Sequence, residues 1–324
     1  MTKEEVILTK QIDMNNNWDS IKEVETDAFC LFRERLGNSQ LISQVRIHSS
    51  NAFETLKADK HLSKIFSSML DVYNQLPYHP DIAFDAAWRC LEYEMKLYAQ
   101  RAWGARADMK LDVFFPRVCK EIFESLINSD IHLQNAFNLL LCNVSLSSLK
   151  YMTVRIYFRK DLSVAPQMSF VKGRATSILS KELLSALFDA YKNEDGSLDD
   201  MGVNNIARRF DRLLQGLDMN AGDKTFNAIS LEKRIELLIS VVLYSSRCER
   251  FHGDIYSPFK SSKAKLTTYY EYYYLTLCSL FFFWLLMYKL VEREETLPQF
   301  VNFEEIENSV RYTIANMLKI LPKD

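Results

Sequence analysis

Apolar residues recur every three or four positions along most of this chain, which is the spacing of one face of an α-helix. One such stretch covers residues 62–73 and is ended by Pro77 and Pro80. A second begins at Phe84 and keeps one apolar face for about four turns. The same pattern predicts helices over residues 24–36, 112–127, 133–141, 179–191, 203–217, 231–242 and 303–318, with a loop at 218–226. Because the chain has only 8 glycines and 7 prolines, we expect few tight turns and an all-α fold.

The segment from Lys263 to Leu290 is the most apolar part of the chain and is predicted to be one long helix. A helix that is apolar on nearly every face must be buried on nearly every face, and its excess apolar surface suggests that a partner chain packs there too. Within it, residues 272–288 form a run of 17 without charge, at the lower limit of about 17–25 for a membrane-spanning helix. Because this run begins with three tyrosines and contains Thr276 and Ser279, we expect a buried helix and no membrane contact. A membrane-attached interaction protein is the alternative.

The segment from Lys150 to Lys181 combines β-propensity with basic charge. Residues 151–158 are rich in β-branched and aromatic side chains, and they can form a strand or continue a helix from Leu146. Seven basic residues accompany the single acid Asp161, at positions 150, 155, 159, 160, 172, 174 and 181. This is the best candidate in the chain for contacts with phosphate groups, and a solvated face or a partner-binding loop is the alternative.

Arg247 and His252 lie five positions apart, where a predicted helix gives way to a loop. Ser230 is placed to cap the start of that helix, and Gly253 followed by Pro258 stops the pattern. An arginine can bind two phosphate oxygens at once, and a histidine can exchange a proton near neutral pH. The alternative is that Arg247 neutralises carbonyl groups at the helix end and His252 is an ordinary loop residue. The remaining histidines are scattered and are assigned no role: His48, His61, His79 and His132.

The order of these features resembles the HEPN family, which comprises compact α-helical domains, many of them metal-independent ribonucleases. The order is an amphipathic helix, Arg247-x-x-x-x-His252, a glycine, a polar loop and a long apolar helix. Residues 81–92 are similar to the opening helix of that family, in which a tryptophan and a following glutamate are common, here Trp88 and Glu92. The resemblance implies an antiparallel HEPN-like helical bundle with additional helices. The chain is expected to divide into an N-terminal helical extension (1–60) and a HEPN-like domain (61–324). Within that domain, the core helices are expected at about 81–145 and 230–292, and an inserted basic segment at about 146–222.

The resemblance also implies a function. Arg247 and His252 would be the catalytic residues of an endoribonuclease that cleaves RNA through 2′-hydroxyl attack, without metal or cofactor, and two copies of the pair would meet across a homodimer. Family members commonly act as toxins or phage-defence effectors, so an antitoxin or regulatory partner is a further expectation. Basic residues expected to bind RNA are Arg250, Lys260, Lys263 and Lys265 near the pair, and Arg155, Arg159, Lys160, Lys172 and Arg174 in the basic segment. Cys248, where the family usually has a small polar residue, keeps open a non-catalytic HEPN-like module that binds a nucleotide, RNA or a protein.

Composition limits where RNA could bind and where the protein could reside. Charged residues make up 25% of the chain and nearly cancel at a net charge of −2, so any contact with RNA must be local. The six cysteines show no C-x-x-C spacing, which argues for reduced thiols and against a zinc site. The first residues lack the basic and apolar regions of a signal peptide, so a cytoplasmic location is expected.

Overall fold

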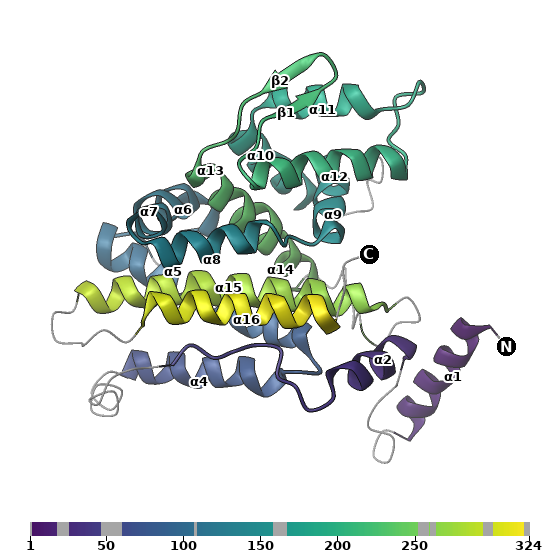
Figure 1. Ribbon diagram of the computed structural model, residues 1–324, viewed down its shortest axis with the longest axis vertical. Coiled ribbons are helices and arrows are strands. Elements are labelled where there is room, and N and C mark those ends of the chain that lie inside the picture. The colour runs from purple at the N-terminus through teal and green to yellow at the C-terminus, as the bar shows by residue number, and fades with distance from the viewer. Residues whose placement is uncertain are drawn as a thin grey trace.

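A computed structural model describes residues 2–17, 26–46, 60–106, 109–157, 167–251, 259, 264–293 and 301–320. Within these ranges the chain is predominantly helical, and one short hairpin is the only sheet that they contain (Figure 1). The all-α prediction is therefore confirmed at the level of fold class.

Helix α15 (Leu266–Arg293) runs through the centre of the molecule, and every side chain in it from Tyr272 to Met287 is buried (Figure 1). It packs along α5 (Pro80–Trp103), where the ring centroids of Phe84 and Tyr272 lie 6.4 Å apart. It also packs against α16 (Phe303–Ile320) and α2 (Asp27–Leu36), and Tyr269 stacks on Phe32 of α2 at 4.3 Å. The chain itself covers this helix, so the expectation of an apolar patch left for a partner chain is wrong. Among the described helices, none has the length and apolar character that crossing a membrane requires.

Hydroxyl groups on α15 explain how a helix so rich in tyrosine can be buried. The Tyr273 hydroxyl donates a hydrogen bond to the carbonyl oxygen of Pro77, just before α5 begins. The Tyr274 hydroxyl donates to the carbonyl oxygen of Leu140, in the last turn of α8 (Ile131–Leu141), at 3.1 Å. Carbonyl groups at helix ends lack partners within their own helix, so each bond satisfies two polar groups at once. These bonds fix α15 between its neighbours.

The part of the chain between α8 and α13 forms one end of the molecule (Figure 1). It consists of α9 (Leu146–Tyr157), α10 (Gln167–Leu179), α11 (Lys181–Tyr191), α12 (Asp200–Leu214), β1 (Met219–Ala221) and β2 (Lys224–Phe226). The ambiguous residues from 151 are helical as far as Tyr157, with Met152 and Ile156 buried. The helix predicted over 179–191 is observed as α11, which begins at Lys181 because Ser180, with a φ of 72°, caps it. Residues 218–226, predicted as a loop, contain the hairpin, whose turn places Gly222 at a φ of 60°.

Two π-helical segments occur in the remaining helices. The remaining elements are α1 (Lys3–Asn16), α4 (Lys60–Gln75), α6 (Leu111–Val118), η1 (Cys119–Glu124), α7 (Ser125–Ser129), α13 (Leu231–Glu236), η2 (Leu237–Leu243) and α14 (Tyr244–Phe251). The side chain of Ser230 caps α13 as predicted, accepting from the backbone N–H of Lys233 at 3.3 Å. The seven residues of η2 are all buried, and η2 leads directly into α14. The π segments widen their helices locally, a feature that recurs at functional sites.

Candidate active site

Arg247 forms an ion pair with Glu92, and this contact joins α14 to α5. The Nη2 atom of Arg247 lies 3.4 Å from Oε2 of Glu92, and the two side chains are only 21% and 16% exposed. Glu92 and Arg247 come from the two separate segments on which the family resemblance rests. The fold therefore brings both segments to one half-buried polar site.

The carboxylate of Glu92 is held in place by its own helix. Trp88 Nε1 donates a hydrogen bond to Glu92 Oε2 at 2.9 Å, and the ammonium group of Lys96 lies 2.7 Å from Oε1. Both contacts span four residues, the spacing at which side chains meet on a helix. Both oxygens of Glu92 are thus engaged, so the orientation of the carboxylate beside Arg247 is fixed by the folded protein.

Aromatic rings form a floor beneath this polar site. Trp88 is fully buried, and its ring lies 5.7 Å from the ring of Tyr244, the first residue of α14. The ring of Phe115 on α6 meets Tyr244 edge-on at 5.5 Å. Such packing excludes water from one side of the Arg247–Glu92 pair, which strengthens electrostatic interactions there.

A second arginine reaches the same site from the basic segment. The guanidinium of Arg174, on α10, lies 4.8 Å from the centre of the Tyr244 ring. Its Nη2 atom donates to the hydroxyl of Ser245 at 3.5 Å. Stacking of an arginine on an aromatic ring is favourable and keeps the guanidinium in a defined plane. Arg174 is therefore one member of the predicted RNA-binding set that the structure places beside α14.

Tyr244 and Cys248 form a pair on successive turns of α14. Burial, followed by the hydrogen-bonded thiol of Cys248, raises the pKa of Tyr244 to about 12, while Arg174 and Arg247 act in the opposite direction. The phenol therefore stays protonated at neutral pH and is not a base. The thiol at position 248, which departs from the usual family pattern, has a structural partner in this ring.

The other predicted site residues have different outcomes. Five of them lie outside the described residues, namely Arg159, Lys160, His252, Lys260 and Lys263. The side chain of Arg250 also lies outside the described part. Arg155 donates to the hydroxyl of Tyr151 on its own helix at 2.7 Å, and Lys172 is exposed on α10. Lys265 lines a separate pocket between α9 and α15. Lys96 and Ser245 were not predicted as site residues, although Lys96 lies one turn after Glu92 and that spacing could have indicated it.

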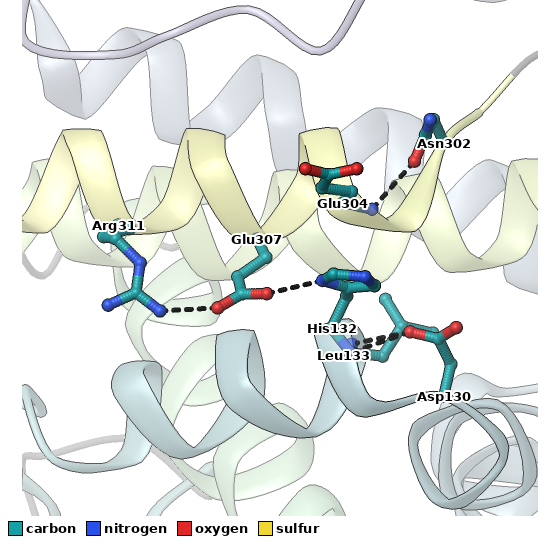
Figure 2. Close-up of polar contacts among 7 residues, drawn as sticks. All are labelled: Asp130, His132, Leu133, Asn302, Glu304, Glu307 and Arg311. Carbon is teal, nitrogen blue, oxygen red and sulfur yellow. Dashed lines mark hydrogen bonds and ion pairs between the residues drawn. The ribbon is translucent and has the colours of Figure 1, made fainter.

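A further polar cluster joins α8 to α16 (Figure 2). Nδ1 of His132 lies 2.7 Å from Oε2 of Glu307, whose other oxygen accepts from Arg311. The hydrogen bond that His132 donates to Glu307 raises the pKa of His132, and the same bond lowers the pKa of Glu307. Asp130 caps α8 by accepting from the backbone N–H of His132 at 2.8 Å. His132, which was assigned no role, therefore links two helices.

In the described part of the chain, no group of three or more His, Cys, Asp or Glu side chains is arranged to hold a metal ion. Comparisons with known protein families, with curated proteins and with solved structures find no match to this chain. The chemistry of the site must therefore be inferred from its own residues.

Proposed function

We propose that this protein is a metal-independent endoribonuclease whose catalytic residues are Arg247 and His252. The observation that carries the proposal is the ion pair between Arg247 and Glu92, with Trp88 hydrogen-bonded to the same carboxylate. It joins the Arg-x-x-x-x-His segment to the tryptophan and glutamate of the helix that resembles the HEPN opening helix. Cellular roles as a toxin or phage-defence effector, with an antitoxin or regulatory partner, belong to the same proposal.

RNA supplies its own nucleophile in this reaction. A base takes the proton of the 2′-hydroxyl, the 2′-oxygen attacks the neighbouring phosphorus, and an acid protonates the departing 5′-oxygen. The products are a 2′,3′-cyclic phosphate and a 5′-hydroxyl. His252 can serve as base or acid because its ordinary pKa lies near 6.5. The family resemblance places a second copy of the pair across a homodimer, so that one histidine removes a proton and the other donates one.

Arg247 would neutralise the negative charge that develops on the phosphorane, which is usually the larger catalytic contribution. Its guanidinium carries five N–H donors in one plane, so a contact with Glu92 through Nη2 fixes that plane and is compatible with donation to a phosphate. Glu92 would therefore act as a positioning residue. Arg174 would add a second guanidinium beside the same helix for the RNA backbone.

Cleavage of total RNA in the presence of EDTA tests the proposal. We expect the wild-type protein to produce 2′,3′-cyclic phosphate and 5′-hydroxyl ends, and the His252→Ala variant to be inactive. His79→Ala is the matched control. His79 lies directly before α5 and thirteen residues before Glu92, which is about 20 Å along the helix, and its side chain makes no cap hydrogen bond. Cleavage by His252→Ala at the wild-type rate would exclude the assignment.

The same ion pair also favours a second proposal, in which Arg247 only connects α14 to α5. The protein would then be a non-catalytic HEPN-like module that binds a nucleotide, RNA or a partner protein, and Cys248 would be the departure associated with lost activity. A wild-type protein that retains RNA on a filter but leaves it intact would favour this alternative.

A further inference from the structure

A pocket of about 570 Å³ lies where α9, α12 and the first turns of α15 meet. Its volume falls within the range of about 300–1,000 Å³ that is typical of sites for small organic ligands. The pocket is on the side of α15 that carries Tyr270 and Glu271, whereas Tyr272 and Thr276 on the same helix face α5. It is therefore distinct from the contact between Glu92 and Arg247, which lies on the α5 side.

Three cationic side chains from three different elements line this pocket. They are Lys150 on α9, Arg208 on α12 and Lys265, the residue before α15. In the part of the chain that the structure describes, none of the three has an ion-pair partner. Asp211 is the other charged group of α12 in the lining, and one of its oxygens accepts from Gln215 at 3.0 Å. Cations that converge on a cavity without carboxylate partners are expected to attract an anion.

Glu271 is the second carboxyl group of the pocket, and it reduces the positive charge less than a normal glutamate would. Burial raises the pKa of Glu271 to about 7, although a hydrogen bond from the hydroxyl of Ser148, at 3.1 Å, acts in the opposite direction. The charged groups that face it are Lys150 on α9, Arg208 and Asp211 on α12, and Lys265. At neutral pH a large share of Glu271 is therefore protonated and can donate a hydrogen bond to an anion.

Hydrogen-bond donors accompany these charges. Ser145 and Ser147 lie at the start of α9, and Thr267 and Thr268 lie in the first turn of α15. Hydroxyl groups suit phosphate oxygens, and the N–H groups at the start of each helix add positive potential in support of the cations. The apolar part of the lining is the half-buried side chain of Leu146, and the buried side chains of Val144 and Tyr270 lie behind it. The lining thus combines a cationic, hydroxyl-rich part with an apolar part.

We propose that this pocket binds a small phosphate monoester with an organic part about the size of a nucleoside. The phosphate would lie among Lys150, Arg208 and Lys265, and the organic part would pack against Leu146. An inorganic phosphate ion alone would leave most of the volume and the apolar part unused. The site does not depend on RNA cleavage, because none of these residues belongs to the pair of Arg247 and His252.

Calorimetric titration of the full chain tests the pocket with three probes: adenosine 5′-monophosphate, inorganic phosphate and adenosine. We expect the monophosphate to bind at least about tenfold more tightly than either other probe, because only it can use both parts of the lining. Arg208→Ala and Lys150→Ala should each weaken its binding about tenfold, the scale of one lost charge-assisted hydrogen bond. Lys120→Ala, which removes an exposed lysine of η1, is the matched control and should bind as the wild type does.

Glu271→Gln tests the carboxyl group separately, because glutamine stays neutral at every pH. Between pH 6 and pH 8 the wild-type carboxyl ionises and repels the phosphate, so the affinity of Glu271→Gln relative to wild type should rise. A constant ratio would contradict this role.

Equal affinity for adenosine and the monophosphate, or unchanged binding by both Arg208→Ala and Lys150→Ala, would overturn the proposal. Inorganic phosphate that binds as tightly as the monophosphate would also overturn it. Loss of binding in Arg247→Ala would move the ligand to the candidate active site, whereas retained binding supports a separate pocket. Inactivity of the protein toward RNA would leave these results unaffected.

Discussion

Arg247 is the residue at which chemistry and stability can be separated. Arg247→Lys keeps the positive charge beside Glu92 but loses the planar arrangement of donors. If Arg247 grips the phosphorane, we expect RNA cleavage to slow by about 100-fold or more, the scale of losing one oxyanion donor. The melting temperature should change little, because a lysine can still pair with Glu92. Melting and cleavage should be measured on the same preparation.

The matched control for this substitution is Arg117→Lys. Arg117 also pairs with a glutamate, Glu121, at 2.7 Å, and its guanidinium lies 4.3 Å from the centre of the Trp103 ring. Its ion pair joins α6 to η1, whereas that of Arg247 joins α14 to α5. If Arg247→Lys instead lowers the melting temperature and leaves cleavage per folded molecule normal, Arg247 serves only to join α14 to α5. The loss in the free energy of unfolding should then be no more than about 1 kcal/mol.

At the scale of residues, the sequence identified both partners of the central ion pair but not their contact. Glu92 and Arg247 stood out within their own segments, yet their approach depends on how α5 and α14 pack, which local spacing does not determine. The contact of Arg174 with Tyr244 is equally tertiary. The pair of Tyr244 and Cys248 is different, because its members lie four positions apart on one helix and could have been predicted.

At the scale of elements, the joint between α8 and α16 should make stability depend on pH (Figure 2). The pKa of His132 is raised above its ordinary value of 6.5, so its contribution is complete below that pH and is lost as pH rises through the raised pKa. The pKa of Glu307 is lowered from 4.5, so its contribution is lost only as pH falls through the lowered value. The joint should therefore stabilise most between about pH 4.5 and 6.5.

Thermal melting of His132→Gln tests this joint. The melting temperature of the variant should lie below that of the wild type at pH 5.5, and the difference should shrink toward pH 8.5 as the pH rises through the raised pKa of His132. His79→Gln controls for the loss of a histidine elsewhere. A difference of the same size at both pH values would show that charge on His132 does not hold α8 to α16.

Spacing predicted most helices because their apolar faces are buried and a face repeats every 3.6 residues. The start of α11 was placed two residues early, at 179, because Ser180 caps that helix with a φ of 72°. Spacing missed features that are too short to show a repeat. The strands of the hairpin are three residues each, too short for an alternating pattern to register. The strand propensity of residues 151–157 was overridden by burial of one helical face.

In the whole molecule, the surface that covers α15 comes from the same chain. The composition of α15 predicted burial correctly, but composition does not say whether the covering surface comes from the same chain. Helices α2, α5 and α16 all pack on it, and its side chains from Tyr272 to Met287 are buried in one chain. Apolar surface on α15 therefore gives no reason for a dimer. A homodimer now follows only from the proposed reaction, which uses two histidines per site.

A site shared by two copies should lose activity when the copies separate. We expect the cleavage rate per molecule to fall on dilution below the dissociation constant of the dimer, with light scattering reporting the change in mass over the same range. An approximately tenfold excess of the His252→Ala variant should also inhibit wild-type protein, because most wild-type chains would then pair with a copy that lacks the second histidine. The same mass of an unrelated protein should have no effect. A monomer whose rate per molecule is constant on dilution, and which the variant does not inhibit, would contradict the shared site and confine the chemistry to one chain.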